Sequence, residues 1–247
     1  IVEDGSHALG GWMDDGEGGL TTVGASRFGD LTTFSFHPVK AIACGEGGAV
    51  TTADPALAER IARLRNHGMV HEPERHTANE LARSDDGAAN PWYYEMPEPG
   101  LNYRLSDIHC ALGLSQLGKL GGFIARRRAL VARYDAQLAA LAPTVIGRVP
   151  GGRPAWHLYP VLIDFPAAKL DRARLMARLA EREIGTQVHY LPVHLQPYYR
   201  ALNGDADLPG ARAYYRSCLS LPLFPAMTDA DVSRVAECLA DCLEIAG

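Results

Sequence analysis

One short stretch limits strongly what this chain can fold into. Residues 34–40 read Phe-Ser-Phe-His-Pro-Val-Lys, and a glycine-rich turn at 45–48 reads Gly-Glu-Gly-Gly. The β-branched and aromatic residues at 32–36 predict a buried strand. Pro38 ends that strand, because proline has no N–H to donate to a sheet. Lys40 is therefore predicted to project from the end of a core strand into a partly enclosed site.

A lysine in this position has a functional and a plain interpretation. Loss of solvent around an ammonium group lowers its pKa and favours the free amine. A neutral amine in a dry pocket is what imine formation with a carbonyl compound requires. The plain interpretation is a surface lysine in a β-turn. The residues around Lys40 leave both interpretations open.

The composition fits a globular protein and argues against two classes of partner. The 247 residues suffice for one large or two modest domains, and 47% of them are hydrophobic, enough for a sizeable core. Lys and Arg number 24 against 29 Asp and Glu, a net charge of −5, whereas nucleic-acid-binding proteins carry basic patches. No apolar run reaches the length of a membrane-spanning helix. We therefore expect neither nucleic acid nor membrane as a partner.

Cysteine and histidine spacing argues against a metal centre. His67, His71 and His76 match no standard zinc spacing and have no cysteine nearby. The five cysteines lack a Cys-x-x-Cys motif, and we expect reduced core residues of a cytosolic protein. They are Cys44, Cys110, Cys218, Cys238 and Cys242. The sequence predicts no metal.

Strand and helix signals alternate along the whole chain. Asp54 followed by Pro55 is a typical helix start, with the aspartate as N-cap and the proline in the first turn. Residues 69–99 form a long polar stretch that we expect at a substrate entrance or a dimer contact. The alternation predicts an α/β core followed by an α+β unit. Strands are predicted at 1–4, 31–36, 49–52, 157–164 and 186–190, and helices at 106–117, 123–141, 170–183, 209–217 and 229–245.

The lysine stretch is one of several motifs that occur in a fixed order. An acidic segment at 2–10 reads Val-Glu-Asp-Gly-Ser-His-Ala-Leu-Gly, 64–68 reads Leu-Arg-Asn-His-Gly, and 100–107 reads Gly-Leu-Asn-Tyr-Arg-Leu-Ser-Asp. Together with Ala-Leu-Gly-Leu-Ser-Gln-Leu at 111–117, they resemble the DegT/DnrJ-type nucleotide-sugar aminotransferases, which are fold-type I pyridoxal-phosphate (PLP) enzymes. Residues 189–199, which include two histidines and three tyrosines, look most like the pseudaminic-acid branch of that family.

The resemblance implies an α/β fold in two parts. Residues 1–120 are expected to form the C-terminal part of the large, mixed-sheet PLP-binding domain, and 151–247 a small α+β C-terminal domain. Residues 121–150 are expected to be a connecting helix and linker. Family members carry a long N-terminal portion before the acidic motif, with a Gly-Thr/Ser loop for the phosphate. We therefore expect the sequence to be a fragment of a complete enzyme.

Three local expectations accompany this division. The acidic, glycine-rich segment 12–20 makes the spacing between the acidic motif and the lysine longer than usual in the family, and we expect a surface loop. Arg126, Arg127 and Arg128 are expected on the exposed side of the helix at 123–141. Residues 147–154 are expected to be a linker.

The resemblance assigns the central chemistry to Lys40 and Asp4. Lys40 corresponds to the lysine that forms a Schiff base with PLP and then moves the substrate proton. Asp4 corresponds to the partner of the pyridine nitrogen, which keeps the ring an electron sink. We expect a low pKa for Asp4 because it faces a cation. Glu3 is the rival for this role, and a loop-capping aspartate is the plain alternative.

Further roles are implied for five side chains. His7 is expected near the cofactor ring, although a buried, hydrogen-bonded histidine would fit nearly as well. Ser35 is expected to contact the cofactor phosphate, and Asn102 to reach the phosphate of the partner subunit's cofactor, which implies a homodimer. Without the resemblance, Asn102 would be a turn residue beside a glycine. His189 and His194 are expected to line the nucleotide-sugar site.

These roles imply a cytoplasmic PLP-dependent aminotransferase. The expected reaction moves the amino group of L-glutamate to the C4 keto group of a UDP-linked 4-keto-6-deoxy-N-acetylhexosamine, as in pseudaminic-acid-type synthesis. The alternatives are another nucleotide 4-keto sugar, such as a UDP-4-keto-pentose, and a non-catalytic homologue. A PLP-dependent sugar dehydratase of the same fold is disfavoured, because those relatives replace the lysine.

Overall fold

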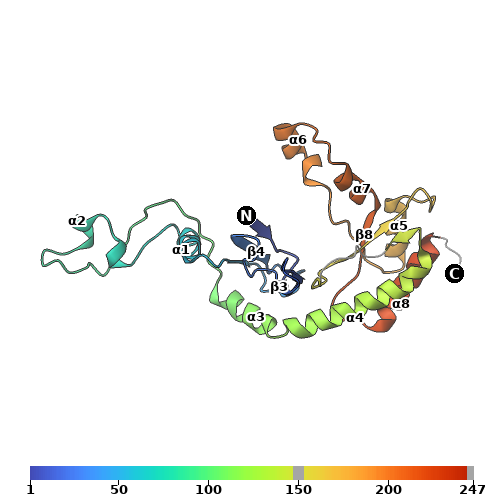
Figure 1. Cartoon of the computed structure of the whole chain (residues 1–247), viewed down its shortest axis with the longest axis horizontal. Coiled ribbons are helices and arrows are strands. Elements are labelled where there is room, and N and C mark those ends of the chain that lie inside the picture. Colours follow the sequence, from blue (N-terminus) through green and yellow to red (C-terminus); the bar gives the residue numbers. More distant parts are fainter. Residues whose placement is uncertain (147–152, 244–247) are drawn as a thin grey trace. The chain divides into compact units, whose positions relative to one another are not determined.

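The computed structural model describes residues 1–146 and 153–243, apart from the side chain of Asn79. The chain divides into two compact units, which are described separately below. The first comprises residues 1–9 and 15–118, and the second 10–14 and 119–247. Figure 1 follows the elements of both along the chain. The predicted domain boundaries at 120 and 150 stay a prediction.

The first unit is built on a three-stranded sheet with the order β1-β4-β5. Strand β1 (Val2–Asp4) runs parallel to β4 (Leu31–Ser35), which pairs antiparallel with β5 (Gly48–Thr51). In β4, Thr32 and Phe34 are buried and alternate with half-buried neighbours, as expected for a central strand. The predicted strands in this unit are confirmed.

The helices of the first unit begin where the sequence predicts. Helix α1 (Pro55–Leu64) starts at Asp54, whose carboxylate accepts hydrogen bonds from the backbone N–H groups of Ala56 and Leu57. Helix α3 (Asp107–Leu117) is capped by the hydroxyl of Ser106. Such caps satisfy N–H groups that have no partner inside the helix.

The long stretch 69–99 contains short helical elements, η1 (Pro73–Arg75) and α2 (Asn79–Ala82), and Figure 1 shows α2 near its tip. The Glu95 carboxylate organises it by accepting hydrogen bonds from the backbone of Thr77 and Ala78 and from the Tyr93 hydroxyl. These bonds lower the pKa of Glu95 to about 2. The stretch is therefore ordered by one ionised side chain.

The expected surface loop at 12–20 is correct for residues 15–19 and wrong at its ends. The structure has strand β2 (Trp12–Asp14) there, and strand β3 (Leu20–Thr22) begins at its end. The glycines instead form the turn between them, where Asp15 accepts the N–H groups of Glu17 and Gly19. Charge and glycine content indicated the turn and hid the flanking strands, which are only three residues long.

The second unit packs helices on an antiparallel sheet with the order β6-β7-β8. The strands are β6 (Val145–Ile146), β7 (Tyr159–Ile163) and β8 (Cys218–Leu221). Helix α4 (Leu120–Leu138) packs along α8 (Asp229–Leu243), and Figure 1 shows them side by side. The remaining elements are η2 (Ala139–Leu141), α5 (Arg172–Glu181), η3 (Val193–Leu195), α6 (Pro197–Asn203) and α7 (Pro209–Ser217).

A continuous core holds the second unit together. Tyr134 of α4 and Tyr159 of β7 are fully buried and stack with ring centres 4.6 Å apart. Their hydroxyls remain hydrogen-bonded, to the Pro222 carbonyl and the Asp135 carboxylate respectively. Burial and the nearby Asp231 charge raise the pKa of Tyr134. The two tyrosines thus join helix and sheet without leaving a buried polar group unpaired.

In the second unit one predicted strand is absent, three elements were not predicted, and one expected segment lies mostly outside the described residues. The expected strand at 186–190 is absent from the described structure, and only Gln187 bridges to Ser220 of β8. Strands β6 and β8 and helix α6 were not predicted. Most of the expected linker at 147–154 lies outside the described residues.

The expectation for Arg127 is also wrong. Arg128 is exposed, but the Arg127 side chain is only 4% exposed. Its terminal nitrogen donates to the backbone carbonyls of Trp156, His157 and Leu223, at 2.8 to 3.1 Å. The sequence placed Arg127 correctly within a helix. It did not indicate that the side chain is buried, because the carbonyls that accept its hydrogen bonds come from segments distant in sequence. Arg127 therefore fastens two loops of the second unit to α4.

This arrangement predicts a difference between neighbouring arginines. Arg127→Leu leaves buried carbonyls without a donor and should lower the free energy of unfolding by about 2–4 kcal/mol. Arg128→Leu, at an exposed position of the same helix, should change it by less than about 0.5 kcal/mol. Urea denaturation followed by circular dichroism measures both. Equal losses in the two variants would contradict the assigned role of Arg127.

Candidate active site

The segment after β4 is a closed turn that carries Lys40. The N–H of Phe36 donates to the Gly47 carbonyl, and the N–H of Cys44 donates to the Phe36 carbonyl. Ile42 and Cys44 are buried inside the turn. Gly47 has a φ of 151°, and a Cβ there would lie 2.8 Å from Leu105. The turn is therefore fixed by packing, and the positive φ of Gly47 favours glycine at this position.

Lys40 is half-buried in this turn, and its backbone N–H donates to the His37 carbonyl at 2.9 Å. Burial lowers the pKa of the Lys40 ammonium, while the negative charge of Asp4 opposes the shift. The predicted direction is confirmed. The hydrogen bond to His37 also places Lys40 in a β-turn, as the plain interpretation has it, but the side chain is half-buried.

Asp4 ends β1 at the same edge of the sheet. It lies opposite Thr33 in the parallel pair, so β1 and β4 end side by side, and Lys40 follows β4. The pKa of Asp4 is lowered, as predicted, but chiefly by hydrogen bonds from the side chain and the backbone N–H of Ser6. The positive charges of His7 and Lys40 contribute less. The expected cause, a facing cation, is therefore secondary in the chain itself.

The rival carboxylate is engaged elsewhere. Glu3 accepts a hydrogen bond from the hydroxyl of buried Thr32 at 2.6 Å. Adjacent residues of a strand point to opposite faces, so Glu3 and Asp4 cannot both face the lysine. The Coulombic interaction of Asp4 with Lys40 favours Asp4 for the proposed role.

His7 and Ser35 lie close to this pair. His7 is half-buried and near enough to Asp4 to lower the pKa of its carboxyl. Ser35 is the last residue of β4, and its hydroxyl oxygen accepts the His37 N–H at 3.4 Å. The structure thus gathers Asp4, His7 and Lys40 into one cluster, with Ser35 on the strand that precedes the lysine.

Asn102 lies on a second segment of the same unit. It is exposed, and the backbone around it bonds to the end of α1, where Asn102 bridges to Asn66. Two glycines allow this close approach. A Cβ on Gly68 would lie 1.9 Å from the Glu98 carbonyl, and one on Gly100 would lie 2.1 Å from the Gly68 nitrogen. Asn102 is therefore presented to solvent on a pinned backbone.

The two predicted substrate histidines belong to the second unit. Nδ1 of His189 lies 2.8 Å from the Ser220 hydroxyl, which ties the histidine to β8. Nε2 of His194 is buried and has no hydrogen-bond partner among the described residues. The structure brings these histidines into one segment, 189–194, but into a different compact unit from Lys40.

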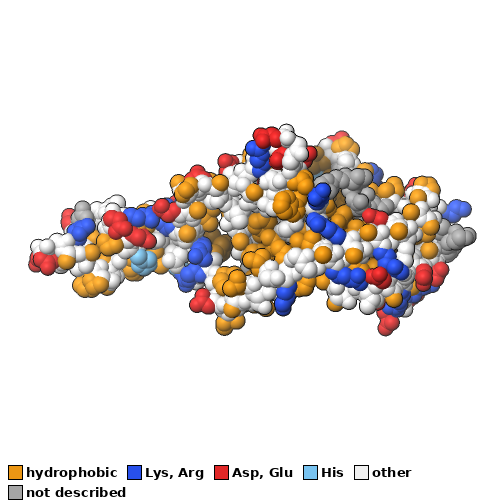
Figure 2. Space-filling view, turned by 60° about the horizontal axis from the view of Figure 1, so that its bottom comes forward, with side chains coloured by type: hydrophobic (Ala, Val, Ile, Leu, Met, Phe, Trp, Pro, Cys, Tyr) orange, Lys and Arg blue, Asp and Glu red, His pale blue; other side chains and the backbone are white. Residues whose placement is uncertain are grey.

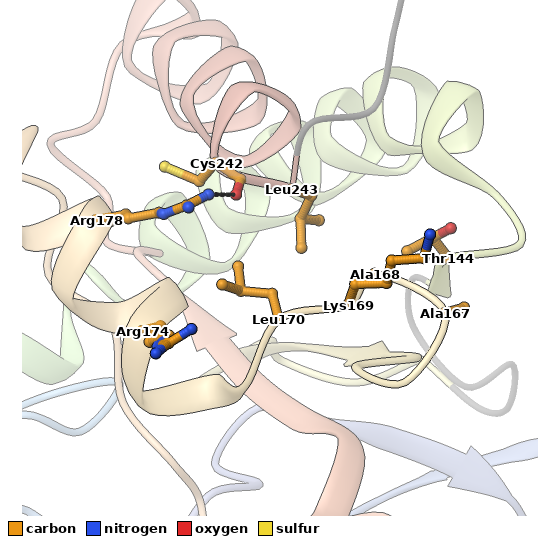
Figure 3. Close-up of a pocket in the computed structure, with 9 residues that line it drawn as sticks. All are labelled: Thr144, Ala167, Ala168, Lys169, Leu170, Arg174, Arg178, Cys242 and Leu243. Atoms are coloured by element: carbon orange, nitrogen blue, oxygen red, sulfur yellow. Dashed lines mark hydrogen bonds between the residues drawn. The ribbon is translucent and has the colours of Figure 1, made fainter.

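Figure 3 shows a pocket of about 360 Å³ in the second unit that contains none of the predicted site residues. Lys169, Arg174 and Arg178 line it together with the end of α8. Arg178 donates to the Cys242 carbonyl at 2.8 Å, which caps the C-terminus of that helix. The pocket contains no residue of the lysine site.

Two further properties complete the description. Within residues 1–146 and 153–243, no three His, Cys, Asp or Glu side chains are grouped so as to hold a metal ion. In the same residues, no helix has the length and apolar character needed to cross a membrane. All five cysteines are free, and Cys110 is exposed, which corrects the expectation that every cysteine is a core residue.

A half-buried amine beside an ionised carboxylate, at one sheet edge, is the pair that a PLP enzyme uses. Residues 1–240 match the DegT/DnrJ/EryC1/StrS aminotransferase family, and the chain belongs to this family. The spore coat polysaccharide biosynthesis protein SpsC of Bacillus subtilis (strain 168) is 39% identical over 259 residues, covering 99% of this chain and 60% of SpsC.

Solved structures agree with the family. The structure of Helicobacter pylori PseC, an aminotransferase involved in the biosynthesis of pseudoaminic acid, has a TM-score of 0.84 and 29% identity, covering 98% of this chain and 59% of PseC. The putative sugar aminotransferase Spr1654 of Streptococcus pneumoniae, in its PLP form, has a TM-score of 0.80 and 26% identity, covering 99% of this chain and 57% of Spr1654. The chain thus spans about three fifths of the length of these relatives.

These findings confirm the predicted fold class, a mixed α/β fold of the fold-type I enzymes. The family, and the PLP and PMP forms of Spr1654, support PLP as the cofactor. The residues present fit that cofactor, because partial burial lowers the pKa of the Lys40 amine and hydrogen bonds lower the pKa of the Asp4 carboxyl. Ser6 was not among the predicted site residues. The spacing Asp-x-Ser, typical of a turn in which aspartate accepts an N–H two residues on, was the available signal.

Burial and the Asp4 charge shift the pKa of Lys40 in opposite directions, so the direction of the shift on removing Asp4 can be tested. Asp4→Asn removes the charge that raises the pKa of Lys40, so the free amine should persist to lower pH. Competitive labelling with a trace amine reagent across pH, read by peptide mass spectrometry, measures this. Lys119 and Lys169 in the same digests are internal controls and should not move. A Lys40 titration that stays in place, or moves to higher pH, would show that the two groups do not interact.

Proposed function

We propose that the complete protein is a PLP-dependent aminotransferase that acts on a UDP-linked 4-keto-6-deoxy-N-acetylhexosamine. L-glutamate would donate the amino group, and the C4 keto carbon of the sugar would receive it. The observation that carries the proposal is the Lys40–Asp4 pair, in which burial favours the free amine next to an ionised carboxylate. The similarity to PseC supports the pseudaminic-acid-type substrate.

Each residue of the cluster has a task in this proposal. When bound, PLP supplies an aldehyde that carries the amino group and a ring that withdraws electrons from the reacting carbon. Lys40 Nζ would hold the cofactor, remove the proton from the α-carbon of glutamate, and later deliver a proton to C4 of the sugar. Asp4 would pair with the ring nitrogen, and His7 would lie near the ring. The hydroxyl of Ser35 would donate a hydrogen bond to the phosphate.

Asn102 and helix α3 support a homodimer. Asn102 is exposed on a rigid segment, where it could contact a phosphate in a second subunit. Helix α3 leaves large apolar side chains in water, with Ile108 81% and Leu114 72% exposed, and Figure 2 shows hydrophobic side chains over this region. Exposed apolar patches of this kind mark protein contacts. We assign the contact to a second copy of the chain, with shared active sites.

His189 and His194 are proposed to contact the nucleotide sugar. The segment 189–194 also exposes Tyr190 and Val193, so it offers both aromatic and polar surface. His194 Nε2, buried without a described partner, would gain one from a ligand hydroxyl or phosphate. The UDP group, the glutamate donor and the cytoplasmic location come from the family resemblance and stay predictions.

Another nucleotide 4-keto sugar is the second candidate. SpsC, at 39% identity, is a spore coat polysaccharide biosynthesis protein, and its identity to this chain exceeds the 29% of PseC. An acceptor used for a surface polysaccharide is therefore also supported. Incubating the complete protein with PLP, glutamate and either keto sugar, and weighing the products, separates the two. The amino sugar differs in mass from the keto sugar that received the nitrogen.

Lys40→Ala tests the proposed function in the complete protein. The variant should lose the absorbance band of covalently held PLP, and turnover should fall by about 10²- to 10⁴-fold or more, because the base is lost. Lys119→Ala, which also removes a lysine, is the matched control and should leave both unchanged. Retained turnover in Lys40→Ala would overturn the proposal. A wild-type protein that neither binds PLP nor aminates a keto sugar would indicate a non-catalytic homologue.

A further inference from the structure

The segment that leads into Lys40 lies outside the packed core. Residues 37–39 are exposed, and the Val39 side chain is 61% exposed. After the lysine the chain turns inward again, and Ile42 is buried. Packing therefore fixes the backbone that follows Lys40, whereas the backbone that precedes it depends on hydrogen bonds.

His37 accepts the hydrogen bonds that order this segment. The N–H of Val39 donates to Nδ1 of the His37 ring at 3.3 Å, and the N–H of Lys40 donates to the His37 carbonyl at 2.9 Å. Pro38, between them, has no N–H to donate. Any residue at position 37 would supply the carbonyl, but the bond from Val39 needs a side chain that accepts a hydrogen bond at this place.

The other ring nitrogen of His37 faces the far end of the same turn. Nε2 lies 3.8 Å from Oε1 of Glu46, which stands two residues before β5. Because Nδ1 accepts a hydrogen bond, the neutral ring carries its proton on Nε2, on the side of the carboxylate. The two side chains are 47% and 77% exposed, so their attraction is weak. One imidazole thus lies between the two ends of the turn that carries Lys40.

We infer that His37 is a positioning residue, which holds the backbone from which the Lys40 side chain reaches the bound cofactor. The inference rests on the proposed function, because it takes Lys40 as the lysine that holds PLP. Nδ1 accepts the Val39 N–H only while the ring is neutral, since both nitrogens of a protonated ring are donors. Imidazole side chains change their charge between about pH 5 and 8. The hold on the segment before Lys40 is therefore lost in acid, when the charged ring is drawn toward Glu46.

The charged groups around this ring leave its two contacts undisturbed. Among the described residues, Glu46 is the charged group that lies against His37, while the charge of Lys40 interacts with that of Asp4. Helix α3 packs on the turn through His109, whose ring bonds to the hydroxyl of its own helix cap. The remaining titratable groups of the turn and of α3 are Cys44, Asp107 and Cys110. A change in the charge of His37 therefore acts on the two ends of its own turn.

Two amide substitutions separate the ring nitrogens in the complete protein. His37→Asn places an oxygen near the position of Nδ1, so it keeps an acceptor for the Val39 N–H that does not titrate. His37→Gln places its amide near the position of Nε2, so it keeps a polar group close to Glu46 and loses that acceptor. We expect His37→Gln to bind PLP about two- to tenfold more weakly than His37→Asn, as for the loss of one hydrogen bond. Absorbance titration with PLP measures the difference.

Hydrogen exchange of the peptide that contains Val39, in the protein without PLP, gives a readout that does not depend on turnover. Protection is expressed relative to the intrinsic exchange rate at each pH. At about pH 8 the wild type and His37→Asn should protect this amide about two- to tenfold better than His37→Gln. At about pH 5 the wild type should fall to the level of His37→Gln, while His37→Asn keeps its protection. The wild-type comparison needs no substitution, so it stands even if a variant folds poorly.

The outcomes separate this inference from the proposed function. If His37→Asn and His37→Gln bind PLP equally while Lys40→Ala loses it, Lys40 has its role and the inference about His37 is wrong. Protection of Val39 that is the same at both pH values in the wild type, or that falls equally in His37→Asn, would overturn the inference as well. If Lys40→Ala binds PLP as the wild type does, the proposed function itself is wrong, whatever the exchange of Val39 shows.

Discussion

The candidate site depends on the parallel pairing of β1 with β4. Parallel strands end at the same sheet edge, so the register that sets Asp4 opposite Thr33 also brings Asp4 to the place where Lys40 leaves the sheet. A shift of one residue would turn Asp4 to the other face and bring Glu3 to the lysine. Thr32 is buried on β4 and hydrogen-bonded to Glu3. This hydrogen bond favours the register in which Asp4, and not Glu3, faces the lysine.

The electrostatics of the pair are a balance in which burial prevails. A lysine next to a carboxylate would ordinarily be held charged, and a charged amine cannot attack an aldehyde. Here the loss of solvent around Lys40 exceeds the effect of Asp4, and the pKa falls. The pKa of Asp4 is meanwhile lowered more by its hydrogen bonding with Ser6 than by the charge of the lysine. The two pKa shifts therefore have different main causes, burial for Lys40 and hydrogen bonds for Asp4, and the charge of each group adds a smaller effect on the other.

What the sequence predicted well is local in origin. Asp54 and Ser106 were recognised as helix starts because a cap involves residues within one turn of the chain. Strand β4 was recognised because β-branched and aromatic residues are concentrated in it. The burial of Arg127 was missed because its acceptors, such as the Leu223 carbonyl, lie about a hundred residues away. Strand β8 was missed because its four residues are all buried and show no alternation.

The site residues also differ in whether their placement follows from local sequence or from contacts between distant segments. Lys40 and Asp4 could be identified because each stands in a motif, and their approach was a consequence of two strands that the sequence also indicated. Asn102 is different, since its presentation depends on Gly68 and Gly100 meeting across thirty residues of intervening chain, where side chains would collide. Sequence shows such glycines only as two turn residues. In the structure, these two glycines let the backbone segment that carries Asn102 bond to the end of α1. A side chain on a backbone held in this way suits the proposed contact with a phosphate in a second subunit.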